Sequence, residues 1–164
     1  MRLTVFASAA LLALGLPIAT FAAGGGADPP KPTAVAPAVP ADPNFAQAKA
    51  MIEAKNYAGA LPLLQQVVQR DPRNADAYNL MGYATRAGGN PRGSLQYYTQ
   101  ALAIDARHLG AHEYLGEAYL MLDQPADADK MLARLDSLCV FGCTEYRMLK
   151  TAIANYKQGR KPTN

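Results

Sequence analysis

The sequence predicts an all-helical protein in which three pairs of helices stack one after another and a final helix closes the stack. A block of 34 residues recurs without a gap at 41–74, 75–108 and 109–142. Within each block, two stretches with helical apolar spacing flank a short break, and residues 144–157 add one more apolar helical stripe. Repetition at such a period is typical of an α-solenoid, in which each repeat buries its apolar face against the next.

The first 22 residues have the pattern of a secretory signal peptide. Arg2 precedes an apolar run from Leu3 to Leu16, Pro17 breaks any helix, and small residues follow as far as Ala22. The apolar run is too short for a membrane span. We expect cleavage after Ala22 and a protein that is periplasmic or secreted, without a stable membrane span; an uncleaved anchor is the alternative.

Residues 23–42 are dominated by proline, alanine and glycine and show no apolar period. Such a stretch buries too little apolar surface to offset the entropy of ordering, so it predicts a disordered linker. The alternative is that its PPKP segment acts as a proline-rich ligand. We expect the helical domain over 43–157 and a flexible tail over 158–164.

The helix pairs are indicated by small residues that recur where two helices must approach closely. They stand at Ala48, Gly82 and Gly116 in the first helices and at Ala60, Ser94 and Ala128 in the second. Large apolar residues follow four positions after the second set, at Leu64, Tyr98 and Leu132, and are expected to fill the interface. Pro91 and Pro125 fit the first turn of a second helix, where the missing N–H is harmless.

These residues resemble the tetratricopeptide repeat family. The middle block matches the family pattern through Tyr78, Gly82, Tyr98 and Ala101, the third through Leu115, Gly116, Tyr119 and Ala128, and the first through Ala60 and Pro72. The first block departs from the pattern at Asn44 and Gln47, where the family has apolar residues. The resemblance covers roughly 100 residues. The end of the chain also resembles small exported bacterial proteins of this type, which implies no activity.

The last predicted helix, 144–157, has the features of a capping helix. Tyr146, Leu149, Ile153 and Tyr156 fall on one face at intervals of 3, 4 and 3 residues. We interpret this stripe as packing against the third repeat, because a repeat stack needs its terminal apolar face covered. Thr144 is placed to act as the N-cap.

The resemblance implies a non-enzymatic module that binds a peptide or partner protein in a concave groove lined by the first helices. Carried over by position, the groove-facing residues are Phe45, Lys49, Ile52, Asp76, Asn79, Tyr83, Arg86, Glu113, Glu117 and Leu120. We expect Asn79 and Arg86 to bind a peptide backbone and a carboxylate, and Tyr83 to offer a stacking surface. Glu113 and Glu117 favour a partner with some positive charge. The alternative is a merely solvated face.

Other function classes find little support in the sequence. The net charge of +3 is mild and its basic residues are scattered, which does not suggest a nucleic-acid binder. The HEYLG segment at 112–116 lacks the second histidine of a zinc-protease helix, and no glycine-rich phosphate loop is present. We therefore expect no enzyme activity and no cofactor.

The two cysteines, Cys139 and Cys143, lie where the last repeat meets the capping helix. Because export leads to an oxidising compartment, a disulfide is the favoured interpretation. It requires the helix to break between them, with Gly142 providing the turn. Two alternatives remain open: a zinc-like site formed with His108 and His112, or a thiol-redox function.

Overall fold

The computed structural model describes residues 42–163, and this part of the chain holds seven α-helices and no strand. The helices are α1 (Pro43–Glu53), α2 (Tyr57–Arg70), α3 (Ala75–Ala87), α4 (Pro91–Ile104), α5 (Leu109–Met121), α6 (Pro125–Leu138) and α7 (Thr144–Lys157). The expected signal peptide and all of the expected linker except Asp42 lie outside the described residues. Among the described helices none is long and apolar enough to cross a membrane.

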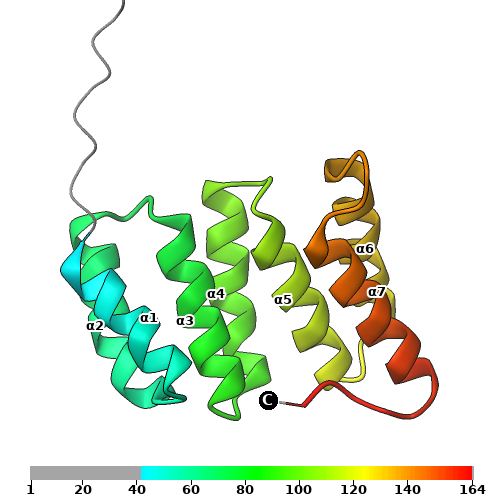
Figure 1. The fold of residues 1–164 in the computed structure, drawn as a ribbon, viewed down its shortest axis with the longest axis horizontal. Coiled ribbons are helices and arrows are strands. Elements are labelled where there is room, and N and C mark those ends of the chain that lie inside the picture. Colours follow the sequence, from blue (N-terminus) through cyan, green and yellow to red (C-terminus); the bar gives the residue numbers. More distant parts are fainter. Residues whose placement is uncertain (1–41, 164) are drawn as a thin grey trace, which may run out of the picture. The chain divides into compact units, whose positions relative to one another are not determined.

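The helices form three antiparallel pairs, α1/α2, α3/α4 and α5/α6, that follow one another in chain order (Figure 1). Each pair packs on the next through its second helix, and the first helices also contact one another, α1 with α3 and α3 with α5. The last helix, α7, packs against both α5 and α6. The predicted solenoid of three helix pairs with a capping helix is confirmed.

Most helices begin at a side chain that satisfies an otherwise unpaired backbone N–H. The same type of cap recurs at 34-residue spacing in successive first helices: Asn74 accepts from the Ala77 N–H, and His108 accepts from the Ala111 N–H. In the second helices, Asn56 and Asn90 accept from the N–H three residues on. Proline occupies the first turn of α1, α4 and α6, as expected for Pro91 and Pro125.

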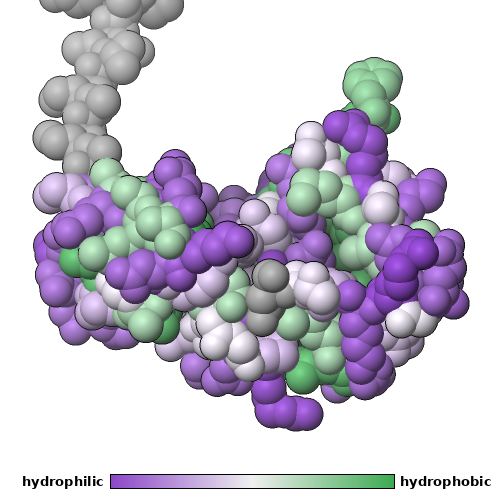
Figure 2. Space-filling model, turned by 60° about the horizontal axis from the view of Figure 1, so that its bottom comes forward, coloured by the Kyte–Doolittle hydropathy of each residue, from purple (hydrophilic) through white to green (hydrophobic). Residues whose placement is uncertain are grey.

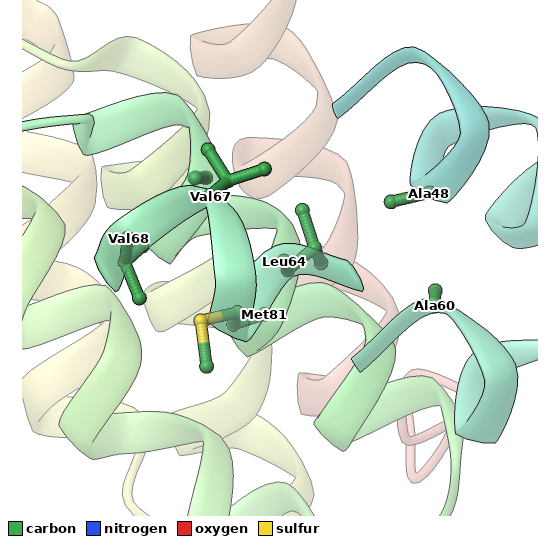
Figure 3. Close-up of a cluster of buried hydrophobic side chains, with 7 residues drawn as sticks. Ala48, Ala60, Leu64, Val67, Val68 and Met81 are labelled. Carbon is green, nitrogen blue, oxygen red and sulfur yellow. The ribbon is translucent and has the colours of Figure 1, made fainter. Parts of the chain in front are cut away.

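The first core cluster shows how the small residues bring a pair together. Ala48 of α1 and Ala60 of α2 are fully buried, and their size lets the two helices approach. Leu64, Val67, Val68, Ala77 and Met81 complete the cluster, so that it joins the first pair to α3 (Figure 3). A compact apolar core at each pair interface is therefore the main support of the stack.

Two predicted glycines are close-packing sites. A Cβ atom at Gly82 would lie 2.5 Å from a ring carbon of Tyr98, which is fully buried in α4. At Gly116 it would lie 2.6 Å from a methyl carbon of Leu149 in α7. Both distances are too short for any real side chain, so each glycine makes room for a large residue on a neighbouring helix.

Two expectations about the end of the stack were wrong. Thr144 is the first residue of α7 and not its cap; Cys143 precedes the helix and makes no side-chain cap hydrogen bond. Leu120 does not face a groove: it is fully buried with Leu149 and Ile153, because α7 covers this end of α5.

Candidate functional site

The first helices α1, α3 and α5, together with the capping helix α7, form one face, which we call the concave face (Figure 1). Three pockets follow one another along it. The smallest, of about 220 Å³, lies between α1 and α3 and is lined by Phe45, Lys49, Asp76, Asn79 and Leu80. Viewed with the lower end forward, the surface is hollowed in its middle, and hydrophobic patches lie among hydrophilic ones (Figure 2). Several of the positions predicted to line a groove thus contribute to these pockets.

The second pocket, which we call the tyrosine pocket, has a volume of about 260 Å³. Its lining consists of Ile52, Glu53, Lys55, Tyr57, Leu80, Tyr83 and Tyr114. The Tyr83 ring meets the Tyr57 ring edge-on at a centroid distance of 6.2 Å and the Tyr114 ring at 5.2 Å. Such contacts fix the rings and leave a rigid, amphipathic wall, which is well suited to hold an apolar side chain of a partner.

Arg86 holds this aromatic wall from the other side. Its guanidinium carbon lies 5.5 Å from the Tyr83 ring centroid and 5.6 Å from that of Tyr114, and one of its nitrogens forms an ion pair with Glu117 at 2.9 Å. Only 4% of Arg86 is exposed. The expected role of Arg86 in binding a ligand carboxylate therefore conflicts with the structure, since its charge is used internally to position the tyrosines.

Glu113 is the most deeply buried charged residue of the concave face, with 2% exposed. Burial, and then the neighbouring carboxylates of Glu117 and Glu145, raise its pKa to about 8. The raised pKa disfavours the charged form of Glu113, while the charge of Glu117 is balanced by the ion pair with Arg86. Together the two glutamates present less negative charge than the sequence suggested, which removes the reason to expect a positively charged partner.

The other predicted groove residues differ in exposure. Lys49 is exposed and lines the smallest pocket, and Tyr83 is half-buried in the tyrosine pocket. Asn79 lines the smallest pocket but is only 7% exposed. Within residues 42–163, the Asn79 Oδ1, Arg86 Nε and Glu113 Oε1 atoms are all buried without a hydrogen-bond partner. Burying a polar atom without a partner opposes folding.

The structure does not bring His108 and His112 together with Cys139 and Cys143. His108 accepts from the Ala111 N–H through Nδ1, so its Nε2 must donate to Asp76, at 3.0 Å. Nε2 of His112 donates to the carbonyl oxygen of Ala106. Across residues 42–163, no group of three or more His, Cys, Asp and Glu side chains could hold a metal ion. The alternative zinc-like site therefore does not assemble, because the histidines serve the start of α5.

The two cysteines flank the turn between α6 and α7. α6 ends at Leu138 and α7 begins at Thr144, so the chain is not helical between Cys139 and Cys143. Gly142 adopts a φ of 75°, which a residue with a side chain rarely adopts. The Cα atoms of the cysteines lie 5.5 Å apart and their sulfur atoms lie at bonding distance. The turn has the form that the disulfide interpretation requires.

Several lining residues were missed by sequence reasoning. Tyr57 opens a second helix, and Leu80 and Tyr114 both stand at the sixth position of their blocks, outside the positions taken to face the groove. The third pocket, between α5, α7 and the C-terminal segment, was not expected at all. Tyr57, Leu80 and Tyr114 come from three successive blocks, so only a comparison of neighbouring blocks could have indicated that they lie together.

The fold and this face define a helical-repeat protein. The chain belongs to the tetratricopeptide repeat family: models described as "Tetratricopeptide repeat" match residues 45–74 and 85–153. Members of this family are in general non-enzymatic scaffolds that bind protein partners, which supports a protein–protein interaction module.

Solved structures agree on the fold. A MamA RS-1 double mutant is 24% identical, with a TM-score of 0.56, and the match covers 58% of this chain and 53% of that one. A second MamA mutant is 17% identical, with a TM-score of 0.55, covering 64% and 58%. This chain therefore spans just over half the length of these proteins. No curated protein gives a significant match.

Proposed function

We infer that this protein binds an extended segment of a partner protein, noncovalently, along its concave face. The observation that carries this is the tyrosine pocket, where three aromatic rings from successive repeats and the apolar side chains of Ile52 and Leu80 surround an open space of about 260 Å³. This volume suits one large apolar side chain, which would act as the anchor of the bound segment.

The neighbouring pocket supplies polar contacts for the same segment. Lys49 and Asp76 are exposed at its edge, where they can form hydrogen bonds with the backbone of a bound segment. An apolar anchor beside groups that bind the backbone is a common way to recognise an extended peptide. The side chains present binding groups without a nucleophile–base pair, so we assign no enzymatic step to this face.

The setting of this function is an oxidising compartment outside the cytoplasm. The signal-peptide pattern over residues 1–22 supports export, and the geometry of Cys139 and Cys143 supports a disulfide between them. The disulfide then clasps the turn before the capping helix. Intact-mass measurement after alkylation tests this: without reductant neither cysteine should react, and alkylation of both would overturn the proposed bond. Sequencing the N-terminus of the exported protein tests cleavage after Ala22.

Affinity capture from an envelope extract tests the binding face. The full chain should recover at least one partner that Tyr83→Ala fails to recover, because this substitution removes one wall of the tyrosine pocket. Tyr97→Ala is the matched control: Tyr97 is also half-buried, but it lies on α4 and packs against the first core cluster. Equal recovery by Tyr83→Ala and the full chain, with both folded by circular dichroism, would show that the binding face is elsewhere.

A further inference from the structure

The largest of these three pockets lies at the α7 end of the concave face. It has a volume of about 600 Å³ and is formed by α7, by Glu117 of α5 and by the segment that follows α7. We call it the α7–tail pocket. Its lining consists of Glu117, Thr144, Arg147, Met148, Thr151, Ala152, Asn155, Arg160, Lys161, Pro162 and Thr163. Residues after Lys157 thus fold back to form one of its walls (Figure 1).

The charges of the lining are mainly positive and only partly compensated. Glu117 is the one carboxylate among these residues, and it is already paired with Arg86. Lys161 is paired with Asp123, at 2.6 Å. Arg147 and Arg160 have no carboxylate partner within residues 42–163.

Both guanidinium groups are held in place by neutral oxygen atoms. Arg147 donates to the carbonyl oxygen of Gly142 and to the hydroxyl of Thr144, at 3.1 and 3.2 Å. Arg160 donates to the side-chain oxygens of Asn155 and Gln158, at 2.7 and 2.6 Å. These bonds orient the two groups without neutralising them, which leaves both able to pair with carboxylates.

The pocket also has apolar surface between the two cations. Met148, which is 48% exposed, lies with Ala152 and Pro162 in the lining. A small inorganic anion would leave this surface uncovered, whereas a peptide segment that carries both carboxylates and an apolar side chain would cover it. The combination therefore favours an acidic segment of a protein.

We propose that the α7–tail pocket binds an acidic segment of the partner protein, with its carboxylates at Arg147 and Arg160. This rests on the proposed function, since it places the acidic segment at the α7 end of the concave face and the apolar anchor in the tyrosine pocket. Four of the eleven lining residues, Arg160 to Thr163, come from the segment after α7, outside the repeats. An acidic partner segment is opposite in charge to the partner that the sequence suggested on the basis of Glu113 and Glu117.

Fluorescence anisotropy with a labelled peptide of alternating glutamate and leucine tests the site, with the lysine-and-leucine peptide as the opposite-charge probe. The full chain should bind the acidic peptide, more weakly as salt is raised, and should not bind the basic one. The double variant R160E/K161E should weaken binding at least about tenfold, because it places negative charge in the pocket. The control R73E/R107E makes the same change in net charge at exposed turns and should bind as the full chain does.

Three results would overturn the proposal: equal binding of both peptides, equal weakening by the control, or complete displacement of the acidic peptide by inorganic triphosphate at equal concentration. The capture experiment separates this failure from that of the proposed function. If R160E/K161E recovers the partner fully while Tyr83→Ala does not, binding on the concave face is supported and the acidic-segment site is wrong. If Tyr83→Ala also recovers it fully, both are wrong.

Discussion

The core between the helices and the concave face are built from the same helices, but they treat buried groups differently. In the core, Ala48 and Leu64 are fully buried among apolar neighbours, so burial itself stabilises them. On the concave face, Asn79, Arg86 and Glu113 are almost as buried, at 7, 4 and 2% exposure. Each of them keeps a polar atom without a partner in the described chain, which costs free energy of folding. The apolar contacts of the core therefore stabilise the stack, whereas the polar side chains of the concave face are buried at a cost.

The largest expected effect lies in the core. Leu64→Ala should lower the free energy of unfolding by about 3–5 kcal/mol, because it removes a fully buried side chain and leaves a cavity between the first two pairs. Urea denaturation measures the loss. Gln65→Ala, at the exposed neighbouring position, should change the free energy by less than about 0.5 kcal/mol. Similar losses for the two variants would contradict the assigned core.

Arg86 is where the two regions meet, so its removal should be almost as costly. Arg86→Met leaves the Glu117 carboxylate unpaired in a largely buried position, and we expect a loss of about 3 kcal/mol. The double variant R86M/E117Q should regain most of that loss, because no unpaired charge remains. If urea denaturation shows the double variant to be as unstable as the single one, the ion pair does not have the role assigned to it.

The turn before the capping helix should contribute less. If Cys139 and Cys143 are bonded, C139S/C143S should be less stable than the oxidised protein by about 2 kcal/mol, since the bond closes only a short loop. Reductant should destabilise the full chain to the same extent and leave the double variant unchanged. Identical urea midpoints for the oxidised and reduced full chain would argue against a stabilising clasp.

Glu113 predicts a dependence of stability on pH. Its pKa rises from an ordinary 4.5 to about 8, through burial and the nearby Glu117 and Glu145, against the opposing effect of Arg86. Between these values the folded protein keeps a proton that the unfolded chain has released. Stability should therefore fall as the pH rises from about 4.5 to about 8, by at most about 1.4 kcal/mol per pH unit.

Glu113→Gln should flatten this dependence, because an amide does not titrate and keeps nearly the same shape. Glu53→Gln, at the exposed end of α1, should retain the slope of the full chain. Denaturation curves at a series of pH values compare the three proteins. An unchanged slope in Glu113→Gln would mean that another group causes the pH dependence.

The sequence was sufficient to predict the packing of the core but not the contacts on the concave face, and the reason is physical. Core positions recur with the helical period, and each can be recognised from the size of its own side chain. The close approach of Gly82 to Tyr98 and the apolar stripe of α7 could therefore be predicted from spacing. The ion pair of Arg86 with Glu117 joins the twelfth position of one repeat to the ninth of the next. It depends on how successive repeats are offset in space.

The α7–tail pocket could not have been predicted from the spacing of residues in the sequence. It exists because the chain turns back after α7, where Lys161 pairs with Asp123 and Arg160 with Asn155. No apolar period marks that segment. The burial of Leu120 was missed for a related reason, since it follows from the position of α7 and not from the repeat pattern.

The central claim, that the partner lies on the concave face, is tested most directly by photo-crosslinking. A photo-reactive phenylalanine analogue replaces Tyr83 in one protein and Tyr97 in another, and both are exposed to light in an envelope extract. We predict a crosslinked partner from position 83, in the tyrosine pocket, and none from position 97 on α4. The same adduct from both positions, or an adduct from position 97 alone, would contradict the account.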